Sequence, residues 1–318
     1  MVSPSNVLVV IDAGAYYLFK DLCEVPTINK YIISTPTSSF LSIAYKLHTN
    51  KKIGEYVWLP YRDVWFHYED IEKLLPSDGY LLVNSMAMSL PTLSFWEKLK
   101  YSHPKVKFVL ILVDSMHGQS KHMREVKKRI QFFPWDIILS YDQNDCVEYG
   151  YRYIGFSYYS HYDNICPSAS SSDLYYISSL KGRENILREI SKACDINGVN
   201  NLFKIYSIWK NIDYGETLRK PLPYTTVLAD ILSTNCILEI LPEGQRAQTL
   251  RYLEAICYKK KLLSNNPDIK NLPLYDERYM HFFDRIEDVD WEWVKRKESV
   301  NYKNTLDISS ADLLNYLF

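Results

Sequence analysis

The chain has 318 residues, enough for about two domains that each bury a core of their own. Its formal net charge is −1, from 37 basic and 38 acidic residues, so it lacks the basic excess by which nucleic-acid-binding proteins neutralise phosphates. No run approaches the ~18 apolar residues of a membrane-spanning helix, and the six scattered cysteines lack metal-ligand spacing, which predicts a soluble protein with reduced thiols.

In the first half of the chain, short apolar runs alternate with amphipathic segments. Residues 106–113 (VKFVLILV) are the strongest strand candidate, and residues 7–11 form a similar run that ends at Asp12. Such runs are typical of strands buried in a parallel sheet. Pro91 is expected in the first turn of a helix. The sequence predicts strands at residues 7–11, 56–59, 80–83, 106–113 and 135–140, and helices at 90–99, 119–130 and 145–149.

A serine-rich stretch at residues 156–173 is typical of a linker between domains. The alternation of strands and helices restarts after it. The final stretch, residues 291–318, is expected to be mostly helical. Between these two stretches we expect strands at residues 174–178, 202–208, 236–240 and 261–264, and helices at 184–194, 224–233 and 248–258.

Strands that alternate with helices predict an α/β protein with doubly wound parallel sheets. We expect two Rossmann-like domains, residues 1–160 and 174–290, facing each other across a cleft. Residues 291–318 are expected to pack back on the first domain. Ligands of open α/β sheets bind at the carboxyl ends of the strands, which places the site in this cleft. A dehydrogenase is disfavoured, because residues 7–14 (VLVVIDAG) contain no GxGxxG pattern.

The densest group of polar residues follows the predicted strand at 236–240 and opens the next helix. The partial positive charge of a helix N-terminus, here near Gln248 and Thr249, favours phosphate. Arg246 and Arg251 can add charge-assisted hydrogen bonds to a diphosphate. Glu254 can accept hydrogen bonds from two ribose hydroxyls. Residues 246–254 are therefore a candidate nucleotide site.

The same residues have plain structural interpretations. Thr249 or Gln248 can simply cap the helix. Arg251 and Glu254 are three positions apart and can form a surface ion pair. A second turn between strand and helix, at residues 178–185 (SSLKGREN), offers Arg183 as a phosphate ligand or as an exposed helix start. Spacing alone leaves these alternatives open.

Residues 237–266 resemble the donor-site segment of bacterial lipopolysaccharide and capsule biosynthesis proteins with a GT-B glycosyltransferase fold. Residues 135–150 and 173–183 are similar to two further segments of that family. Ala247 departs from the pattern, which has a glycine there. The matching residues are Gly244, Gln245, Thr249, Leu250, Arg251, Glu254, Ala255, Lys260, Lys261, Asn265 and Asn266.

The resemblance implies transfer of a sugar from a nucleotide-activated donor to a surface glycan, with no cofactor besides the donor. Glu254 matches the ribose-binding glutamate, and Arg183 matches a diphosphate contact. We expect no metal: the Asp288-Val289-Asp290 triplet lies in an acidic segment and is interpreted as a turn or helix cap. The expected donor-binding residues are Arg183, Gln245, Arg246, Gln248, Thr249, Arg251 and Glu254.

An inverting transfer needs a general base for the acceptor hydroxyl, which should come from the first domain. Asp12 and Asp114 each follow a buried strand, and His117 lies close to Asp114 in the sequence. Asp114 is the preferred base and Asp12 the second candidate, although either can cap a following helix. A retaining transfer needs no such base.

Other functions remain open. The chain could transfer a polyol phosphate from a CDP-linked donor, act as a nucleotide-sugar epimerase, or serve as a non-catalytic scaffold with the same fold. The expected partners are a nucleotide-sugar donor and a glycan or glycolipid acceptor, without nucleic acid. A cytoplasmic location is expected, with contact to the inner face of the membrane allowed.

Overall fold

A computed structural model describes residues 6–50, 61–118, 121–180, 182–241, 246–303 and 309–317. The strand predicted at residues 56–59, as well as Gly244 and Gln245, lies outside the described residues. The chain forms two compact units. Unit 1 comprises residues 1–160 and 308–318, and unit 2 comprises residues 161–307.

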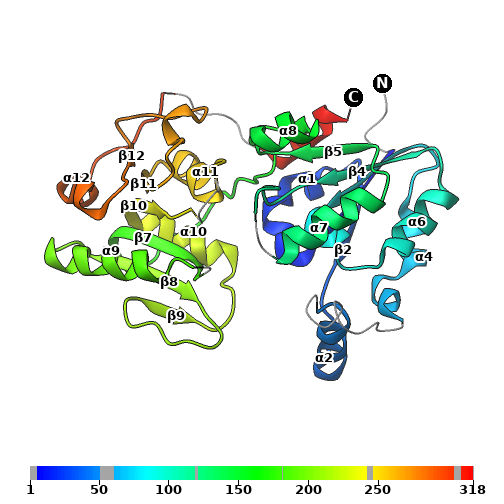
Figure 1. The fold of residues 1–318 in the computed structure, drawn as a ribbon, viewed down its shortest axis with the longest axis horizontal. Coiled ribbons are helices and arrows are strands. Elements are labelled where there is room, and N and C mark those ends of the chain that lie inside the picture. The colour runs from blue at the N-terminus through cyan, green and yellow to red at the C-terminus, as the bar shows by residue number, and fades with distance from the viewer. Residues whose placement is uncertain are drawn as a thin grey trace. The chain divides into compact units, whose positions relative to one another are not determined.

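Unit 1 is built on a six-stranded parallel sheet in the order β2-β1-β3-β4-β5-β6 (Figure 1). Both faces are covered: Leu8 and Val10 pack in one core cluster, and the alternate residues Val7 and Val9 are also fully buried. Burial on both faces explains why these strands are continuous apolar runs. The strands are β1 (Val7–Asp12), β2 (Asn29–Ile33), β3 (Gly79–Asn84), β4 (Val106–Ile111), β5 (Ile137–Ser140) and β6 (Arg152–Tyr153).

The helices of unit 1 add aromatic side chains to its core. Phe95 and Trp96 pack edge to face 5.1 Å apart, and both contact the sheet cluster. The C-terminal 3-10 helix η6 (Ser310–Tyr316) packs on α1 (Lys20–Glu24), where Ser310 Oγ accepts a hydrogen bond from Leu22 N. The other helices are η2 (Ala13–Leu18), α2 (Ser39–His48), η3 (Arg62–Phe66), α4 (Tyr68–Leu74), α5 (Ser85–Met88), α6 (Leu93–Ser102), α7 (Lys121–Phe132) and α8 (Gln143–Tyr149).

Unit 2 has a second six-stranded parallel sheet, in the order β12-β11-β10-β7-β8-β9. Two parallel sheets with helices confirm the predicted α/β class. The four predicted strands of this unit are present, and the short edge strands β9 and β12 were not predicted. The strands are β7 (Ser172–Ser179), β8 (Asn201–Tyr206), β9 (Glu216–Leu218), β10 (Thr234–Glu239), β11 (Lys261–Ser264) and β12 (Met280–Phe282).

One face of this sheet packs against two helices at opposite ends of the unit's sequence. Leu187 of the first and Trp293 of the last belong to the same core cluster as Tyr176 and Leu238. The helix predicted at residues 224–233 is present with those bounds. The helices are α9 (Glu184–Ile196), α10 (Tyr224–Ser233), α11 (Leu250–Cys257), η4 (Ile269–Asn271), η5 (Ile286–Asp288) and α12 (Trp291–Lys295).

Two helix predictions were wrong in detail. The helix predicted at residues 90–99 begins only at Leu93, because Thr92 caps it and accepts a hydrogen bond from Phe95 N; Pro91 therefore precedes the helix. Residues 291–318 are not mostly helical. Their described parts contain the five-residue α12, which packs on β7 and β10 in unit 2, and η6, which lies in unit 1.

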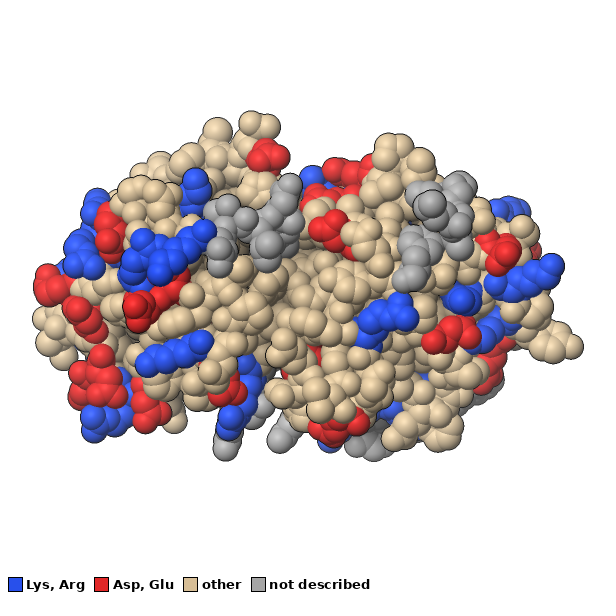
Figure 2. All heavy atoms as spheres, turned by 90° about the horizontal axis from the view of Figure 1, so that it is seen from above, with Lys and Arg blue, Asp and Glu red and all other residues tan. Residues whose placement is uncertain are grey.

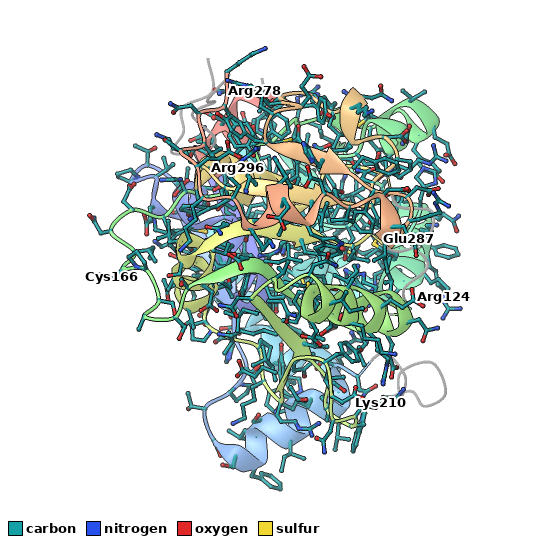
Figure 3. All side chains as sticks on the ribbon, turned by 90° about the vertical axis from the view of Figure 1, so that its left-hand side faces the viewer. Arg124, Cys166, Lys210, Arg278, Glu287 and Arg296 are labelled. Atoms are coloured by element: carbon teal, nitrogen blue, oxygen red, sulfur yellow. The ribbon has the colours of Figure 1, made fainter. Side chains whose placement is uncertain are left out.

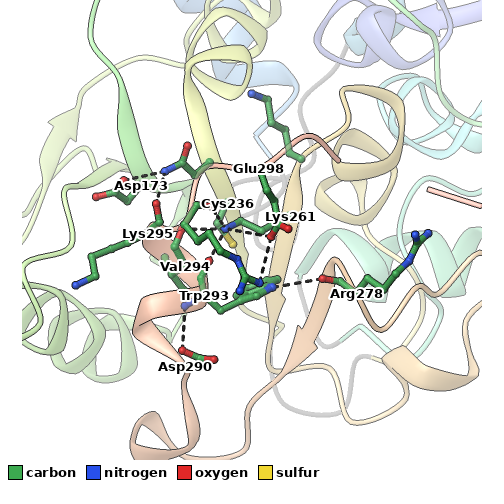
Figure 4. A network of polar contacts seen from close by, with 12 residues as sticks. Asp173, Cys236, Lys261, Arg278, Asp290, Trp293, Val294, Lys295 and Glu298 are labelled. Carbon is green, nitrogen blue, oxygen red and sulfur yellow. Dashed lines mark hydrogen bonds and ion pairs between the residues drawn. The ribbon is translucent and has the colours of Figure 1, made fainter. Parts of the chain in front are cut away.

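Two lysines of the run at residues 259–261 bind carbonyl groups at the C-terminal ends of helices in unit 2. Lys261 is 1% exposed, and its ammonium donates to the last carbonyls of α12, including Arg296 O at 2.5 Å and Trp293 O (Figure 4). Lys260 donates to Leu232 O and Thr234 O at the end of α10. A cation at a helix C-terminus satisfies carbonyls that lack intrahelical partners. Burial lowers the pKa of both lysines.

All six cysteines lie in the described part of the chain and are free thiols. Cys23, Cys194 and Cys236 are buried in the cores, which agrees with the prediction of reduced core thiols. Cys166 differs: it is exposed on the segment before β7 and points outward in Figure 3. This segment runs along α10, where Ser168 N donates to Ala229 O.

Candidate functional site

The strand order of unit 2 reverses between β7 and β10, so the two strands lead their connections away in opposite directions. Such a switch point leaves a crevice at the carboxyl ends of the strands, where open α/β sheets bind their ligands. β7 ends at Ser179 and is followed by Arg183, while β10 ends at Glu239. A cation therefore follows one of these strands and a carboxylate ends the other, at the predicted edge of the sheet.

Arg183 immediately precedes α9 and folds back over the end of β7. Its Nη1 donates to Ser178 Oγ at 2.8 Å and to Ser179 O at 3.4 Å. Its Nε is buried and has no hydrogen-bond partner among the described residues. Fixing one side of a guanidinium in this way leaves donors that can bind an anion.

Glu239 is a site residue that the sequence analysis missed. It is 2% exposed, and its two carboxylate oxygens accept hydrogen bonds from Thr249 Oγ1 and Ser264 Oγ. Burial raises the pKa of Glu239, against the opposing effects of its two hydroxyl partners and the positive charges of Arg251 and Arg183. The available sequence signal was an acidic residue at the end of an otherwise apolar strand.

Thr249 is the N-cap of α11. Its Oγ1 accepts a hydrogen bond from Arg251 N at 3.1 Å and donates to Glu239. The capping role that the sequence left open is thus present, and it also links the helix to the end of β10. The helix starts at Leu250, two residues later than predicted, so Ala247 and Gln248 precede it as buried residues.

Arg251 and Glu254 form an ion pair with Nη1 and Oε2 2.5 Å apart. It is not the surface pair considered as an alternative, because Glu254 is fully buried and the Arg251 side chain is 17% exposed. Tyr224 of α10 donates its hydroxyl hydrogen to the other oxygen of Glu254 at 2.8 Å. Burial raises the pKa of Glu254 to about 7, although both Arg251 and Tyr224 act to lower it.

Asn265 and Asn266 hold the chain on both sides of the turn between β10 and α11. Asn265 Oδ1 accepts a hydrogen bond from Leu241 N at 2.7 Å. The buried Asn266 donates through Nδ2 to Arg246 O at 3.0 Å. Arg246 itself is exposed and pairs with Asp268 at 3.3 Å. The asparagines of the family-like segment therefore bind the backbone of Leu241 and Arg246, the described residues on either side of residues 242–245.

In unit 1 the strand order reverses between β1 and β3, and Asp12 lies at this point. Asp12 N donates to Oδ1 of the fully buried Asn84 at 3.3 Å, which joins the ends of the two strands. Oδ1 of Asp12 accepts a hydrogen bond from Gly14 N at 2.9 Å, so Asp12 caps η2. A Cβ at Gly14 would lie 2.8 Å from that oxygen, which explains the glycine.

Asp114 lies three residues beyond β4 and is exposed. The turn that follows it is fixed by Asp145, whose carboxylate accepts hydrogen bonds from Met116 N at 2.9 Å and Ser140 Oγ at 3.1 Å. His117 Nε2 lies 3.7 Å from Asp145 and 3.5 Å from Glu148. Asp145 is fully buried, and burial raises its pKa. The sequence analysis assigned Asp145 no catalytic or binding role.

The acidic triplet at residues 288–290 is a helix cap, as interpreted from its setting. Asp288 binds Arg285 in a capping box, and Asp290 caps α12 by accepting a hydrogen bond from Trp293 N at 2.9 Å. Among the described residues, no three His, Cys, Asp or Glu side chains are grouped so that they could hold a metal ion. Within the same ranges, no helix is long and apolar enough to cross a bilayer.

Two surface features lie apart from the candidate site. A pocket of about 340 Å³ lies between the segment before β7 and α10, lined in part by Cys166, Thr225 and Asp230, and contains none of the predicted site residues. Figure 2 shows basic and acidic side chains interspersed on the face drawn. That face presents no broad basic field of the kind that attracts nucleic acid.

No family model and no curated protein sequence matches the chain. Solved structures do. A UDP-forming alpha,alpha-trehalose-phosphate synthase from Burkholderia xenovorans has a TM-score of 0.50 at 12% identity, with 88% of each chain covered. At this identity the similarity shows the fold alone, which is the GT-B glycosyltransferase fold.

Two further structures have lower TM-scores. A UDP-N-acetylglucosamine 2-epimerase has a TM-score of 0.48 at 10% identity, over 98% of this chain and 94% of that one. A lipopolysaccharide outer core galactosyltransferase has a TM-score of 0.41 at 12% identity, over 89% and 87% of the two chains.

Proposed function

We propose that this protein is a glycosyltransferase that moves a sugar from a nucleotide-activated donor to a glycan or glycolipid acceptor. The observation that carries the proposal is the polar cluster at the switch point of unit 2. There, Glu239 at the end of β10 lies within the electrostatic influence of Arg183 and Arg251, and Arg251 pairs with the buried Glu254 of α11. The GT-B fold and the resemblance of residues 237–266 to a donor-site segment give further support.

In this proposal the nucleoside diphosphate binds at the Arg183 turn and the start of α11. Transfer of the sugar leaves negative charge on the departing diphosphate, which prearranged cations and helix dipoles stabilise. Arg183 and Arg246 supply the positive charge, and Gln245, Gln248 and Thr249 belong to the same donor segment. Asp114 or Asp12 accepts the proton of the acceptor hydroxyl if the reaction inverts the anomeric carbon.

Glu254 is proposed to bind the donor ribose, and for this its present contacts would have to change. Tyr224 occupies one carboxylate oxygen and Arg251 the other. Ribose hydroxyls reach Glu254 only if Tyr224 moves aside and its hydrogen bond is replaced. The full burial of Glu254 is also the observation that favours the second candidate function, a non-catalytic scaffold with a closed site.

Calorimetric titration with UDP, GDP, CDP and TDP tests the donor site. Arg183→Gln should weaken binding of the preferred nucleotide at least ~10-fold, because a charge-assisted contact to phosphate is lost. The control is Arg188→Gln on the same helix, whose guanidinium pairs with Asp213 at 2.8 Å on the surface. Equal affinity of Arg183→Gln and the unaltered protein would reject the site. No affinity for any nucleotide would favour the scaffold.

Product analysis then separates the enzyme alternatives. Sugar transfer releases a nucleoside diphosphate, whereas a CDP-polyol phosphotransferase releases CMP. With a competent acceptor, Asp114→Asn or Asp12→Asn should lower the transfer rate by ~10²–10⁴-fold while nucleotide affinity stays unchanged. Unchanged rates in both variants would exclude these carboxylates as the base.

A further inference from the structure

Helix α2 of unit 1 carries an apolar stripe on its solvent side. Phe40, Ile43, Ala44 and Leu47 follow the i, i+3, i+4, i+7 spacing of one helix face. That spacing usually marks the face turned to a core. Here Phe40 is 79% exposed, Ile43 60% and Leu47 49%. The helix projects from the sheet of unit 1 in Figure 1.

The opposite face of α2 fixes this orientation. Tyr45 is 6% exposed, and its ring packs edge to face on Trp65 at 5.9 Å. Trp65 Nε1 donates to Nδ1 of His48 at 2.8 Å. Since Tyr45 and His48 hold the helix on unit 1, the packing of α2 itself places Phe40 and Ile43 on the outside. Contiguous exposed apolar side chains of this kind mark an interaction surface.

The charge around α2 indicates the partner. The ten residues of α2 include Lys46 and His48 in its last turn and no aspartate or glutamate. Lys46 is exposed on the helix, one turn from Ile43 and next to Leu47. A second copy of this chain would bring two such helices together, which the like charge of their lysines opposes. An apolar stripe flanked by lysine matches the interface of an anionic bilayer.

The position of α2 connects this surface with the candidate acceptor side. The helix follows β2, whose last residue, Ile33, pairs with Asp12 at the carboxyl edge of the sheet. Burial, together with the nearby Asp12 carboxylate, raises the pKa of Tyr45 to about 12. A membrane that receives α2 therefore lies at the edge that carries Asp12.

We propose that the outer face of α2, formed by Phe40, Ile43 and Leu47 with Lys46 beside it, docks on an anionic lipid bilayer. Docking itself does not depend on sugar transfer. If the proposed function holds, docking presents the acceptor edge of unit 1 to a lipid-linked acceptor. Vesicle binding without nucleotide or acceptor therefore tests docking separately from transfer.

The experiment is flotation of the full chain with vesicles of phosphatidylcholine, with or without phosphatidylglycerol. The unaltered chain should float with the anionic vesicles and much less with the neutral ones. Phe40→Gln with Ile43→Gln should reduce the bound fraction at least ~10-fold, because the inserted apolar surface is lost. Lys46→Gln should weaken binding about fivefold, an effect that salt diminishes.

Val147→Gln is the matched control: it also replaces an exposed apolar helix residue of unit 1, 88% accessible, far from α2 in the sequence. It should float like the unaltered chain. Thermal melting checks that all variants fold. Failure of the unaltered chain to float, or equal flotation of the Phe40/Ile43 variant, would overturn the proposal. A dimer in sedimentation that this variant dissociates, without vesicle binding, would assign the surface to a second copy instead.

Discussion

The carboxyl edges of the two sheets each contain a reversal of strand order, but their carboxylates differ in burial and pairing. In unit 2, Glu239 and Glu254 are enclosed by hydroxyls and by Arg251. In unit 1, Asp114 is exposed and Asp12 is half-buried. The fully buried carboxylate there, Asp145, accepts a hydrogen bond from the backbone N–H of Met116. A reversal of strand order thus brings strand ends together in both sheets, while the side chains decide what each edge can do.

The proposed function assigns a different part of the reaction to each edge. In unit 2, prearranged cations would bind the phosphates of the donor, and the contact between Tyr224 and Glu254 would have to change for the ribose. An edge with accessible carboxylates can exchange a proton with an acceptor hydroxyl. The following predictions test whether the two edges differ in this way, beginning with the largest expected effect.

Glu254→Ala should lower the free energy of unfolding by ~3–5 kcal/mol, because it leaves the largely buried Arg251 guanidinium, which cannot lose its charge, without this partner. Chemical denaturation measures the change. Glu292→Ala is the control, since Glu292 and Lys295 are also three residues apart with a 2.5 Å contact, but Glu292 is 84% exposed. The control should cost less than ~1 kcal/mol. Similar losses of stability in the two variants would contradict the view that the buried pair in unit 2 matters more than an exposed one.

Glu254→Gln should flatten the pH dependence of stability. The folded-state pKa of Glu254 is raised to about 7 from an ordinary value near 4.5. Its contribution is therefore fully present below the ordinary pKa and is lost as the pH rises through 7, a decline of roughly 3 kcal/mol at ~1.4 kcal/mol per pKa unit. Denaturation between pH 5 and 8 should show this decline in the unaltered chain and a smaller one in the variant. Parallel curves would argue against the raised pKa.

Asp145→Ala should cost ~1–3 kcal/mol, because Met116 N and Ser140 Oγ lose their buried acceptor. Denaturation of this variant shows how strongly the edge of unit 1 depends on a carboxylate. Glu148→Ala, which removes a half-exposed neighbour on the same helix, should change stability by less than ~0.5 kcal/mol. A loss for Asp145→Ala as large as that of Glu254→Ala would remove the contrast between the two edges.

The smallest effects on stability are expected at the proposed bases. Asp114→Asn changes an exposed side chain, and Asp12→Asn keeps an N-cap, since asparagine caps helices about as well as aspartate. Each should change the free energy of unfolding by less than ~0.5 kcal/mol in the same denaturation assay. A loss above ~2 kcal/mol at either position would show a structural carboxylate there.

The buried strands and several helices were predictable because local patterns determine them. Continuous apolar runs located β1, β3, β4 and β10, and the helix at 224–233 was placed with its observed bounds. The edge strands β2, β6, β9 and β12 were missed, because strands at a sheet edge are short or polar and lack the apolar run that marks a buried one. The helix that Pro91 had suggested begins later than predicted, because the side chain of Thr92 caps its N-terminus.

For the candidate site, the sequence located the segment, and long-range contacts determined the state of each side chain. Arg251 and Glu254 could be paired from their spacing, but their burial depends on α10, which supplies Tyr224. Glu239 gained its role only when β11 brought Ser264 beside it. Lys260 and Lys261 matched the family segment in the sequence, but only the fold brings their ammonium groups to carbonyls at the ends of α10 and α12.

The sequence by itself determined the α/β class, the parallel strands and the position of the donor-like segment, because apolar periodicity and helix-start residues are local signals. Tertiary structure alone decided which charges are buried, which lysines cap helices and which apolar helix face stays in solvent. The stripe on α2 shows the reason most directly. Its i, i+3, i+4, i+7 pattern specifies an amphipathic helix, but only the packing of Tyr45 and His48 on Trp65 determines that the stripe faces outward.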